Sequence, residues 1–401
     1  MSNTLTEVTS AVTTALSKLP SPESIDNAAR MQLLGALDKL RAALEPPPVT
    51  LLNHCFSFWA LSVIRVAQGM GIFDAFAVAE GTKQLTLDEL NSRTKGDKEL
   101  LFRVMRYLCA QKIFTRPSQE SYQPGPLASQ LSSGLPTANL IKHFYLHMRT
   151  AAHLYEYFEA KDYRNPADAC DAPFQFAQCT RQHHFDWLTE HPDDQEAFNS
   201  TMSMTRTADG IEWFNFYPVE EKLQVASPDR TLLIDIGGGI GHDISAFKQR
   251  FPQLPGQLVL QDLPQVINDI PSPLAGIAAQ SHSMFDAQPV RNAKAYYLRT
   301  VLHDWPDKQA LEVLTRIREA MAEDSVLLIN EHTPAAGGEL SPIAAALDLH
   351  MMQTFSALER TEEQWVALLE KGGFRVVKVW KPQQEGLHLT TTAALYEAVP
   401  Q

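Results

Sequence analysis

Several features that mark secreted, membrane-spanning or disulfide-rich proteins are absent from this sequence. The 401 residues include only four cysteines, and none of these form a Cys-X-X-Cys pair. This spacing argues against a disulfide framework and gives no sign of a metal site, so we expect a reduced, cytoplasmic protein without a bound metal. The N-terminus lacks a basic segment followed by an apolar run, so no signal peptide is predicted. No run of 18 apolar residues occurs, and we expect no membrane-spanning segment.

Basic residues are also in the minority. The chain has 34 Lys and Arg against 47 Asp and Glu, for a formal net charge of −13. Such a surface repels phosphates and anionic lipid, which argues against nucleic acid and membrane partners. Hydrophobic residues make up 44% and charged residues 20% of the chain, which is typical of globular enzymes.

Two helical segments are predicted in the first third of the chain. Residues 1–48 read as a helical N-terminal arm with apolar residues spaced by three and four, and this arm packs either on another subunit or on its own domain. Residues 49–135 read as a winged-helix-like domain, with one helix from Leu61 to Phe73, a capping box from Thr86 to Glu89, and a later hairpin. Because acidic residues accompany its basic ones, we do not expect this domain to bind DNA.

Residues 136–225 are predicted to form a mainly helical connector rich in aromatic residues and histidine. His143, His147 and His153 are expected in one helix. Any one of these rings can be ordinary core packing. Together they favour a lining for a ring-shaped or extended apolar small molecule.

From residue 226 to residue 401, strand and helix patterns alternate. This alternation predicts an α/β domain with a doubly wound, mostly parallel sheet. The expected strands are 231–236, 256–261, 295–302, 325–331, 374–380 and 391–398, and the expected helices are 242–250, 263–269, 308–321 and 365–371.

A glycine-rich loop joins the first of these strands to its helix and reads Asp235-Ile-Gly-Gly-Gly-Ile-Gly241. Glycines let the backbone approach a ligand closely. An acid beside the loop disfavours a dinucleotide pyrophosphate and favours an ammonium group, while Asp262 at the end of the next strand can accept ribose hydroxyls. The pattern therefore predicts S-adenosylmethionine (SAM) as the cofactor. The predicted loop residues are Asp235, Gly237, Gly238, Gly239 and Gly241.

Five motifs carry a resemblance to a known family. They are the glycine loop, Gln261-Asp-Leu-Pro264, Leu302-His-Asp-Trp-Pro306, Asn330-Glu331 and Glu359-Arg-Thr361. In order and spacing they resemble the SAM-dependent small-molecule O-methyltransferases of plants and fungi, the caffeic acid and flavonoid class. The resemblance spans nearly the whole chain. It implies a Rossmann-like SAM-binding domain, an N-terminal dimerisation domain and a homodimer.

The resemblance also implies the site residues. His303 stands at the position of the general base, and Glu331 and Glu359 at those of two carboxylates that orient it. Asp304 matches an acid beside the base, although we favour a structural role for it as the N-cap of the next helix. A small-molecule substrate, aromatic or polyketide-derived, would be lined by His143, Asp304 and Met352.

Further cofactor contacts are implied at Leu263, Met284, Phe285 and Arg299, with Arg299 where plant enzymes have lysine. One position departs from the family, because Ser283 replaces the usual acid at the adenine amino group. Serine can accept one hydrogen bond but carries no charge.

Two other functions remain open at this point. The fungal branch of the family includes SAM-binding pericyclases and dehydratases that act on polyketide–peptide hybrids. The best-known type of these replaces the base histidine with arginine and uses a histidine matching His143, whereas this chain has both His143 and His303. A non-catalytic SAM-binding regulatory module is the third possibility, but it requires a basic face that the composition does not offer.

Overall fold

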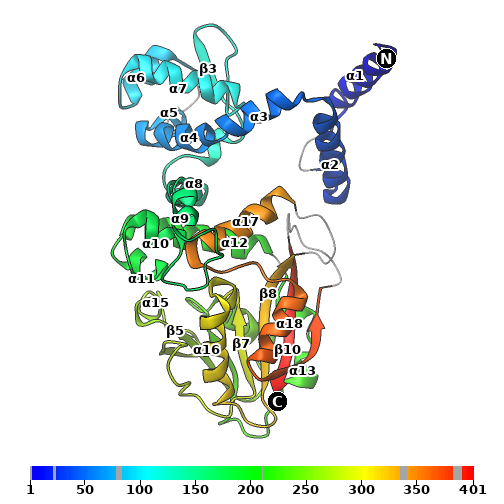
Figure 1. Ribbon diagram of the computed structural model, residues 1–401, viewed down its shortest axis with the longest axis vertical. Coiled ribbons are helices and arrows are strands. Elements are labelled where there is room, and N and C mark those ends of the chain that lie inside the picture. Colours follow the sequence, from blue (N-terminus) through cyan, green and yellow to red (C-terminus); the bar gives the residue numbers. More distant parts are fainter. Residues whose placement is uncertain (1, 21–23, 78–83, 210, 335–340, 383–390) are drawn as a thin grey trace. The chain divides into compact units, whose positions relative to one another are not determined.

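The structure is a computed structural model, which describes residues 2–20, 24–77, 84–209, 211–334, 341–382 and 391–401 (Figure 1). The chain divides into two compact units, Met1–Trp59 and Ala60–Gln401. We describe each unit by itself.

The first unit is built from three helices: α1 (Ser2–Leu16), α2 (Asn27–Leu44) and α3 (Pro47–Phe56). Asp26 caps α2 through a 3.0 Å hydrogen bond from the Ala29 amide. None of the residues of α3 is buried. Large apolar side chains that stay exposed in this unit include Leu33, Leu34, Leu37, Leu51, Leu52 and Phe56. The described part of this unit thus presents apolar surface that its own helices do not cover.

The expectation that no segment spans a membrane stays a prediction, although one segment of the described residues is long and apolar enough to be a candidate by length and composition. Residues Pro47–Met70, which comprise α3 and α4 (Phe58–Met70), have a mean hydropathy of 1.3 in their best window, and none of that window is buried. Polar residues such as Asn53 and His54 interrupt this segment without lowering its mean hydropathy below that of a candidate span. Length and composition alone do not separate a membrane span from an apolar interface helix.

The second unit begins with the rest of the small helical domain, α4 to α7, and a three-stranded antiparallel sheet in the order β1-β3-β2. The helix expected from Leu61 to Phe73 is instead two helices, because Gly71 turns the backbone at a φ of +78°. The capping box of Thr86 and Glu89 is confirmed. The remaining elements are α5 (Ile72–Ala77), β1 (Leu85–Thr86), α6 (Leu87–Arg93), α7 (Lys98–Ala110), β2 (Phe114–Thr115) and β3 (Ser121–Pro124).

The connector is helical, as predicted, but the helix expected to carry three histidines is broken. α8 (Pro136–Ala151) holds His143 and His147, whereas His153 is the N-cap of α9 (Leu154–Ala160). The other connector elements are α10 (Pro173–Gln178), α11 (His184–Thr189), α12 (Pro192–Asp209), η3 (Trp213–Asn215) and α13 (Val219–Lys222), and η2 (Ala128–Gln130) precedes the connector.

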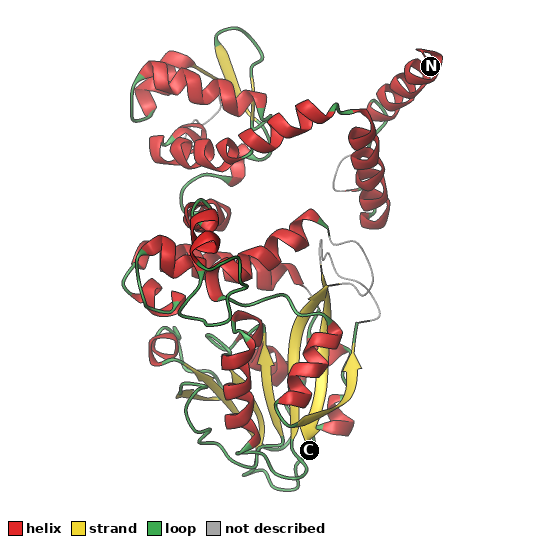
Figure 2. Cartoon of the chain, in the orientation of Figure 1, coloured by secondary structure: helices red, strands yellow, loops and turns green. Residues whose placement is uncertain are grey.

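The predicted α/β domain is confirmed as a seven-stranded sheet in the order β6-β5-β4-β7-β8-β10-β9. Figure 2 shows the strands of this domain in yellow with red helices beside them. β6, β5, β4, β7 and β8 pair in parallel, and β10 runs antiparallel to both β8 and β9. The strands are β4 (Thr231–Ile236), β5 (Gln257–Asp262), β6 (Ala278–Ser281), β7 (Ala295–Arg299), β8 (Val326–Pro334), β9 (Phe374–Trp380) and β10 (Thr391–Pro400). The helices are α14 (His242–Arg250), α15 (Pro264–Asn268), η4 (Leu302–Asp304), α16 (Asp307–Arg318), α17 (Pro342–Phe355) and α18 (Glu362–Lys371).

Both faces of this sheet are buried, which explains the nearly continuous apolar strands. Alternate residues of a strand face opposite sides, so Tyr296 and Ile234 join a core with α16 and α18. Tyr297 and Leu233 join the other core, with α14 and the Trp213 region. The strand expected to run to Leu302 ends at Arg299, and β6 and α17 were not predicted.

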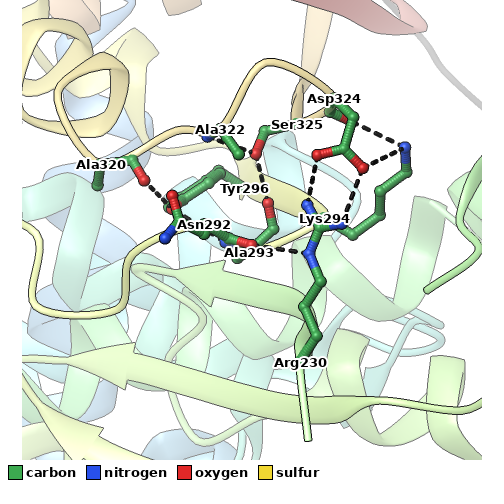
Figure 3. Close-up of polar contacts among 9 residues, drawn as sticks. All are labelled: Arg230, Asn292, Ala293, Lys294, Tyr296, Ala320, Ala322, Asp324 and Ser325. Atoms are coloured by element: carbon green, nitrogen blue, oxygen red, sulfur yellow. Dashed lines mark hydrogen bonds and ion pairs between the residues drawn. The ribbon is translucent and has the colours of Figure 1, made fainter. Parts of the chain in front are cut away.

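The amino ends of β4, β7 and β8 are tied together by a polar network (Figure 3). Arg230 makes two hydrogen bonds to Asp324, at 2.8 and 2.7 Å, and a third to the Asn292 carbonyl at 2.8 Å. Lys294 donates to the Asp324 carbonyl at 2.8 Å. Every cation in this amino-edge network thus has an acceptor, and the network fixes the register of the three strand starts.

Candidate functional site

The glycine loop at the carboxyl end of β4 has the backbone that the sequence predicted. Gly237, Gly239 and Gly241 all have positive φ, at 68°, 62° and 85°. A Cβ atom at Gly238 would lie 2.6 Å from Oδ2 of Asp235 and 2.5 Å from Leu260. Only glycine fits this turn without displacing its neighbours, which leaves open backbone for a ligand.

Asp262 connects the end of β5 to this loop. Its Oδ2 accepts a 2.8 Å hydrogen bond from the Gly239 amide, and its Oδ1 accepts one of 2.7 Å from the Leu263 amide. Burial raises the pKa of Asp262, although both amides oppose that shift. Asp235 is buried at the end of β4, with 1% of its surface exposed. Two acids and an open loop therefore lie together, which suits a ligand with an ammonium group and ribose hydroxyls.

Arg299 lies at the end of β7, and the structure pairs it with a residue that the sequence did not single out. Nη1 of Arg299 lies 3.0 Å and 3.1 Å from the two carboxylate oxygens of Asp243, in the first turn of α14. The Tyr297 hydroxyl donates to the same carboxylate at 3.0 Å. Arg299 thus anchors the helix that follows the glycine loop. Its proposed contact with a cofactor stays a prediction.

The segment from Ser283 to Phe285 forms a turn after β6. The Ser283 hydroxyl accepts a 3.4 Å hydrogen bond from the Phe285 amide, so the serine caps its own turn. Phe285 packs edge-on against Trp305 with ring centroids 4.7 Å apart, and Met284 packs against the same core. The structure therefore brings this turn next to the segment that carries His303.

His303 lies in η4, just beyond β7, with carboxylates at both of its ring nitrogens. Nδ1 lies 3.5 Å from Oε1 of Glu359, and Nε2 lies 3.5 Å from Oδ1 of Asp304. Glu331 sits behind them, and its Oε1 accepts hydrogen bonds from the amides of Val301 at 3.2 Å and Leu302 at 3.1 Å. We name His303, Asp304, Glu331 and Glu359 the His303 cluster.

The residues of the His303 cluster shift one another's pKa values. Burial lowers the pKa of His303, but the three carboxylates outweigh burial and raise it to about 10. Burial raises the pKa of Asp304 to about 7 and also raises that of Glu331. Burial pushes the pKa of Glu359 upward too, but its contact with His303 holds that pKa below the usual value. The imidazole therefore holds its proton tightly while Glu359 stays ionised.

The expected N-cap role of Asp304 was wrong. The N-cap of α16 is Pro306, and no side chain caps this helix. Asp304 lies within η4 instead, so its carboxylate faces His303 rather than the amides of α16. The expected end of a strand at Glu331 was also wrong, because β8 continues to Pro334.

Arg360 supports the His303 cluster, and the sequence did not assign it a role. It is buried, and it donates to the Leu302 carbonyl at 3.0 Å, to the Trp305 carbonyl at 2.8 Å and to Asp307 at 2.8 Å. These bonds clamp the turn on both sides of His303. Its place in the Glu359-Arg-Thr361 motif was the signal that could have identified it.

A second group of histidines lies where α8 meets α17. His143 and His147 come from α8, and His350 from α17, and the ring centroids of His147 and His350 are 4.2 Å apart. Burial lowers the pKa of His143 to about 4 and that of His350 to about 3. Met352 is half-buried on the same helix, and α17 also contacts η4. The predicted substrate residues His143 and Met352 therefore lie on elements that are joined to the His303 cluster through α17.

Comparison with known proteins identifies the family. Residues 183–375 match the model of the O-methyltransferase domain, and residues 52–134 match the O-methyltransferase dimerisation domain. A methyltransferase of Aspergillus candidus, cfoC, is 33% identical over 92% of this chain and 91% of its own length. The chain belongs to the O-methyltransferase family. The demethylsterigmatocystin 6-O-methyltransferase of Aspergillus flavus is 29% identical, over 90% of this chain and 93% of its own.

Solved structures agree with this assignment. A complex of LepI with SAH and a substrate analogue has a TM-score of 0.84 and 27% identity, over 99% of this chain and 100% of that chain. A structure described as a pericyclic reaction enzyme has a TM-score of 0.83 and 27% identity, over 99% of this chain and 100% of that chain. The same fold is therefore found in a protein that binds SAH and in a structure described as a pericyclic reaction enzyme.

Proposed function

We propose that this protein is a SAM-dependent O-methyltransferase acting on a hydroxyl group of an aromatic or polyketide-type small molecule. The observation that carries the proposal is the contact between the glycine loop and the segment that holds His303. A Cβ atom at Gly237 would lie 2.8 Å from the side chain of Val301, which is two residues before His303. The candidate base and the candidate cofactor loop are thus built against each other.

The residues at the carboxyl edge of the sheet suit SAM. Asp235 would face the ammonium group, Asp262 the ribose hydroxyls, and Met284 and Phe285 the adenine ring. Gly237, Gly238, Gly239 and Gly241 would supply close backbone, with Leu263, Ser283 and Arg299 around them. When bound, SAM supplies an electrophilic methyl group. The relatives that carry SAM or SAH support this proposal.

His303 would accept the proton of the substrate hydroxyl. Glu359 at Nδ1 would hold the ring and balance the charge that the proton brings. The substrate oxygen would approach Nε2, which places Asp304 beside it. Glu331 would act through the backbone, because it holds the amides of Val301 and Leu302.

The charge of the site bears on this role. Three carboxylates around one imidazole give His303 a pKa of about 10, close to that of a phenol. Proton transfer from a phenol to neutral His303 is therefore nearly balanced. A cation bound nearby lowers the pKa of His303, so a sulfonium would move the base toward its working range.

The experiment is a methyl-transfer assay with purified protein, SAM labelled in its methyl group and a panel of phenols and hydroxypyridones. We expect label in the organic extract and a product heavier than its substrate by one methyl group in place of hydrogen. The matched control is the Asp324→Asn variant, whose change lies in the amino-edge network. If the His303→Ala variant transfers as much label as the wild-type protein, the assignment of His303 as the base is overturned.

SAM-assisted pericyclic or dehydrative catalysis on a polyketide–peptide substrate is the second candidate function. The raised pKa of His303 favours it, because an imidazolium can donate a hydrogen bond to a carbonyl oxygen at neutral pH. His143 stands in a buried group of rings joined to the His303 cluster through α17. The similarity to a solved pericyclic reaction enzyme supports it too.

The sign of the pH dependence separates the two functions. A base must be neutral, so methyl transfer should rise with pH toward the pKa of His303. A donor must be protonated, so pericyclic turnover should fall as pH passes that pKa. The mass of the product gives an independent answer, because isomerisation leaves the mass unchanged and dehydration lowers it.

The dimerisation-domain match supports a homodimer, and the exposed apolar residues of α2 and α3 are the surface we assign to its interface. Four parts would serve the enzyme: residues 1–48 as an arm, 49–135 as a winged-helix-like dimerisation domain, 136–225 as substrate lining and 226–401 as the catalytic domain. A cytoplasmic location and the lack of a nucleic acid partner stay predictions. A mobility-shift assay with DNA tests the remaining regulatory alternative, which requires a shift.

A further inference from the structure

The three histidines at the junction of α8 and α17 form a group to which the proposed proton transfer at His303 assigns no step. Each offers one ring nitrogen, and these three nitrogens all lie within 4.8 Å of one another. Ring centroids are 4.5 Å apart for His143 and His147, and 5.8 Å apart for His143 and His350. His143 and His147 are one helical turn apart on α8, so both side chains lie on one face of that helix.

One buried polar atom of this group lacks a hydrogen-bond partner. Nε2 of His147 is buried and has no hydrogen-bond partner among the described residues. A buried ring nitrogen without a partner is costly, and a bound ligand removes that cost.

The other nitrogen of His147 is held in place. Nδ1 lies 3.2 Å from the Thr354 hydroxyl, and the Gln353 amide donates to the His147 carbonyl at 3.5 Å. Both partners come from α17, the helix that carries His350. A hydrogen bond at one ring nitrogen that frees the other for a ligand is the arrangement found around metal-binding histidines.

We propose that His143, His147 and His350 bind one divalent transition-metal ion of the zinc type, with a fourth position left for water or for an oxygen atom of the bound small molecule. Imidazole nitrogens hold Zn²⁺ at about 2.0–2.1 Å, which places them about 3.3 Å apart in a tetrahedron. The separations between the three nitrogens therefore shorten by at most about 1.5 Å on binding. All three imidazoles are neutral at physiological pH because they are buried, so none must lose a proton first.

The position of the site suits a ligand with oxygen donors. Glu359 of the His303 cluster is close enough to raise the pKa of His350, and its negative charge offsets part of the charge of the ion. The cysteine spacing predicted no metal site, and these histidine ligands form no local motif because they come from two helices about two hundred positions apart. The inference depends on the geometry of the three histidines and not on the proposed methyl transfer.

The test uses tag-free, full-length protein that has been stripped with a chelator and then titrated with Co²⁺. We expect one equivalent of Co²⁺ per chain and the intense visible absorption of a tetrahedral or five-coordinate site. The His143→Ala and His350→Ala variants should lose this signal. The matched control is His153→Ala, which removes an exposed histidine just beyond α8.

A second measurement keeps the test decisive if a variant unfolds. X-ray absorption of the Zn²⁺-loaded wild-type protein should show three imidazole nitrogens at about 2.0–2.1 Å. An absorption spectrum without imidazole scattering, or Co²⁺ binding that His143→Ala and His350→Ala retain as fully as His153→Ala, would overturn the proposal. Neither readout depends on catalysis, so failure here leaves the proposed function untouched.

Discussion

The two ends of the parallel strands in this protein carry opposite kinds of polar structure. At the amino ends, Arg230 and Lys294 both pair with the carboxylate of Asp324, and Lys294 also donates a hydrogen bond to the Asp324 carbonyl. At the carboxyl ends, three carboxylates surround His303. Each charge of the amino-edge network has a partner of opposite sign and the network is partly open to solvent, whereas the His303 cluster sets three carboxylates against one imidazole.

This difference separates residues that hold the fold from residues that do chemistry. Paired, partly exposed charges contribute modestly to stability, and each partner favours the ionised form of the other. A surplus of buried acids costs stability and produces a histidine and an aspartate with strongly shifted pKa values. Ligands of open α/β sheets bind beyond the carboxyl ends of the strands, which is where the unbalanced cluster lies.

The largest effect is expected for His303→Ala. Loss of a positioned base should reduce methyl transfer by about 10² to 10⁴-fold, while SAM binding stays near that of wild type. Single-turnover assays and calorimetry of SAM binding measure the two quantities. Equal losses of turnover and of SAM affinity would assign His303 to cofactor binding and not to proton transfer.

The next effect is expected for Gly238→Ala in the cofactor loop. The new Cβ would lie 2.6 Å from Asp235 and 2.5 Å from Leu260, so the loop must shift. SAM affinity should fall roughly tenfold or more, which corresponds to about 1.4 kcal/mol. Gly35→Ala is the control, because nothing lies within 4 Å of that position. Unchanged affinity in Gly238→Ala would remove the loop from the proposed site.

The pH dependence of stability and of methyl transfer should change with the His303 cluster and not with the amino-edge network. The folded-state pKa of His303 is about 10, above 6.5 for a free imidazole, so its charge stabilises the fold below about pH 6.5 and this contribution is lost as pH rises to about 10. Glu359→Gln removes one carboxylate and should lower the pKa of His303 by about one unit or more.

Two profiles record that change. The rise of methyl transfer with pH should move to lower pH in Glu359→Gln, and denaturant titrations should show a smaller loss of stability between pH 6.5 and 10. Asp324→Asn should leave both profiles in place, since Asp324 lies at the opposite edge. A wild-type stability profile that is measured without SAM and centred near the pKa of free imidazole would show that the carboxylates do not act as the structure indicates.

The smallest effect is expected for Asp324→Ala in the amino-edge network. It removes the partner of Arg230 at a partly exposed position, so the free energy of unfolding should fall by about 1 kcal/mol. Methyl transfer measured below the unfolding transition should match wild type. A large loss of turnover in this variant would mean that the two edges are coupled.

Much of the fold was predictable because strand and helix periods are local. β4, α14 and β9 were predicted with their observed bounds, and the capping box at Thr86 marked the start of α6. The errors have local causes as well: Gly71 divides an apolar run, and the 3₁₀ turn at Leu302 ends β7 early. α17 was missed, and with it the position of His350.

The sequence by itself determined the class of fold, the cofactor loop and the identity of His303, because each depends on residues that are neighbours along the chain. Only the tertiary structure decided which charges share a site. Asp304 reads as a helix cap in sequence, yet it faces His303. Arg360 reaches the His303 segment from the loop before α18, and His350 meets the α8 histidines from α17. The physical reason is that a pKa or a ligand site depends on distance in space and on burial, and neither can be read from spacing along the chain.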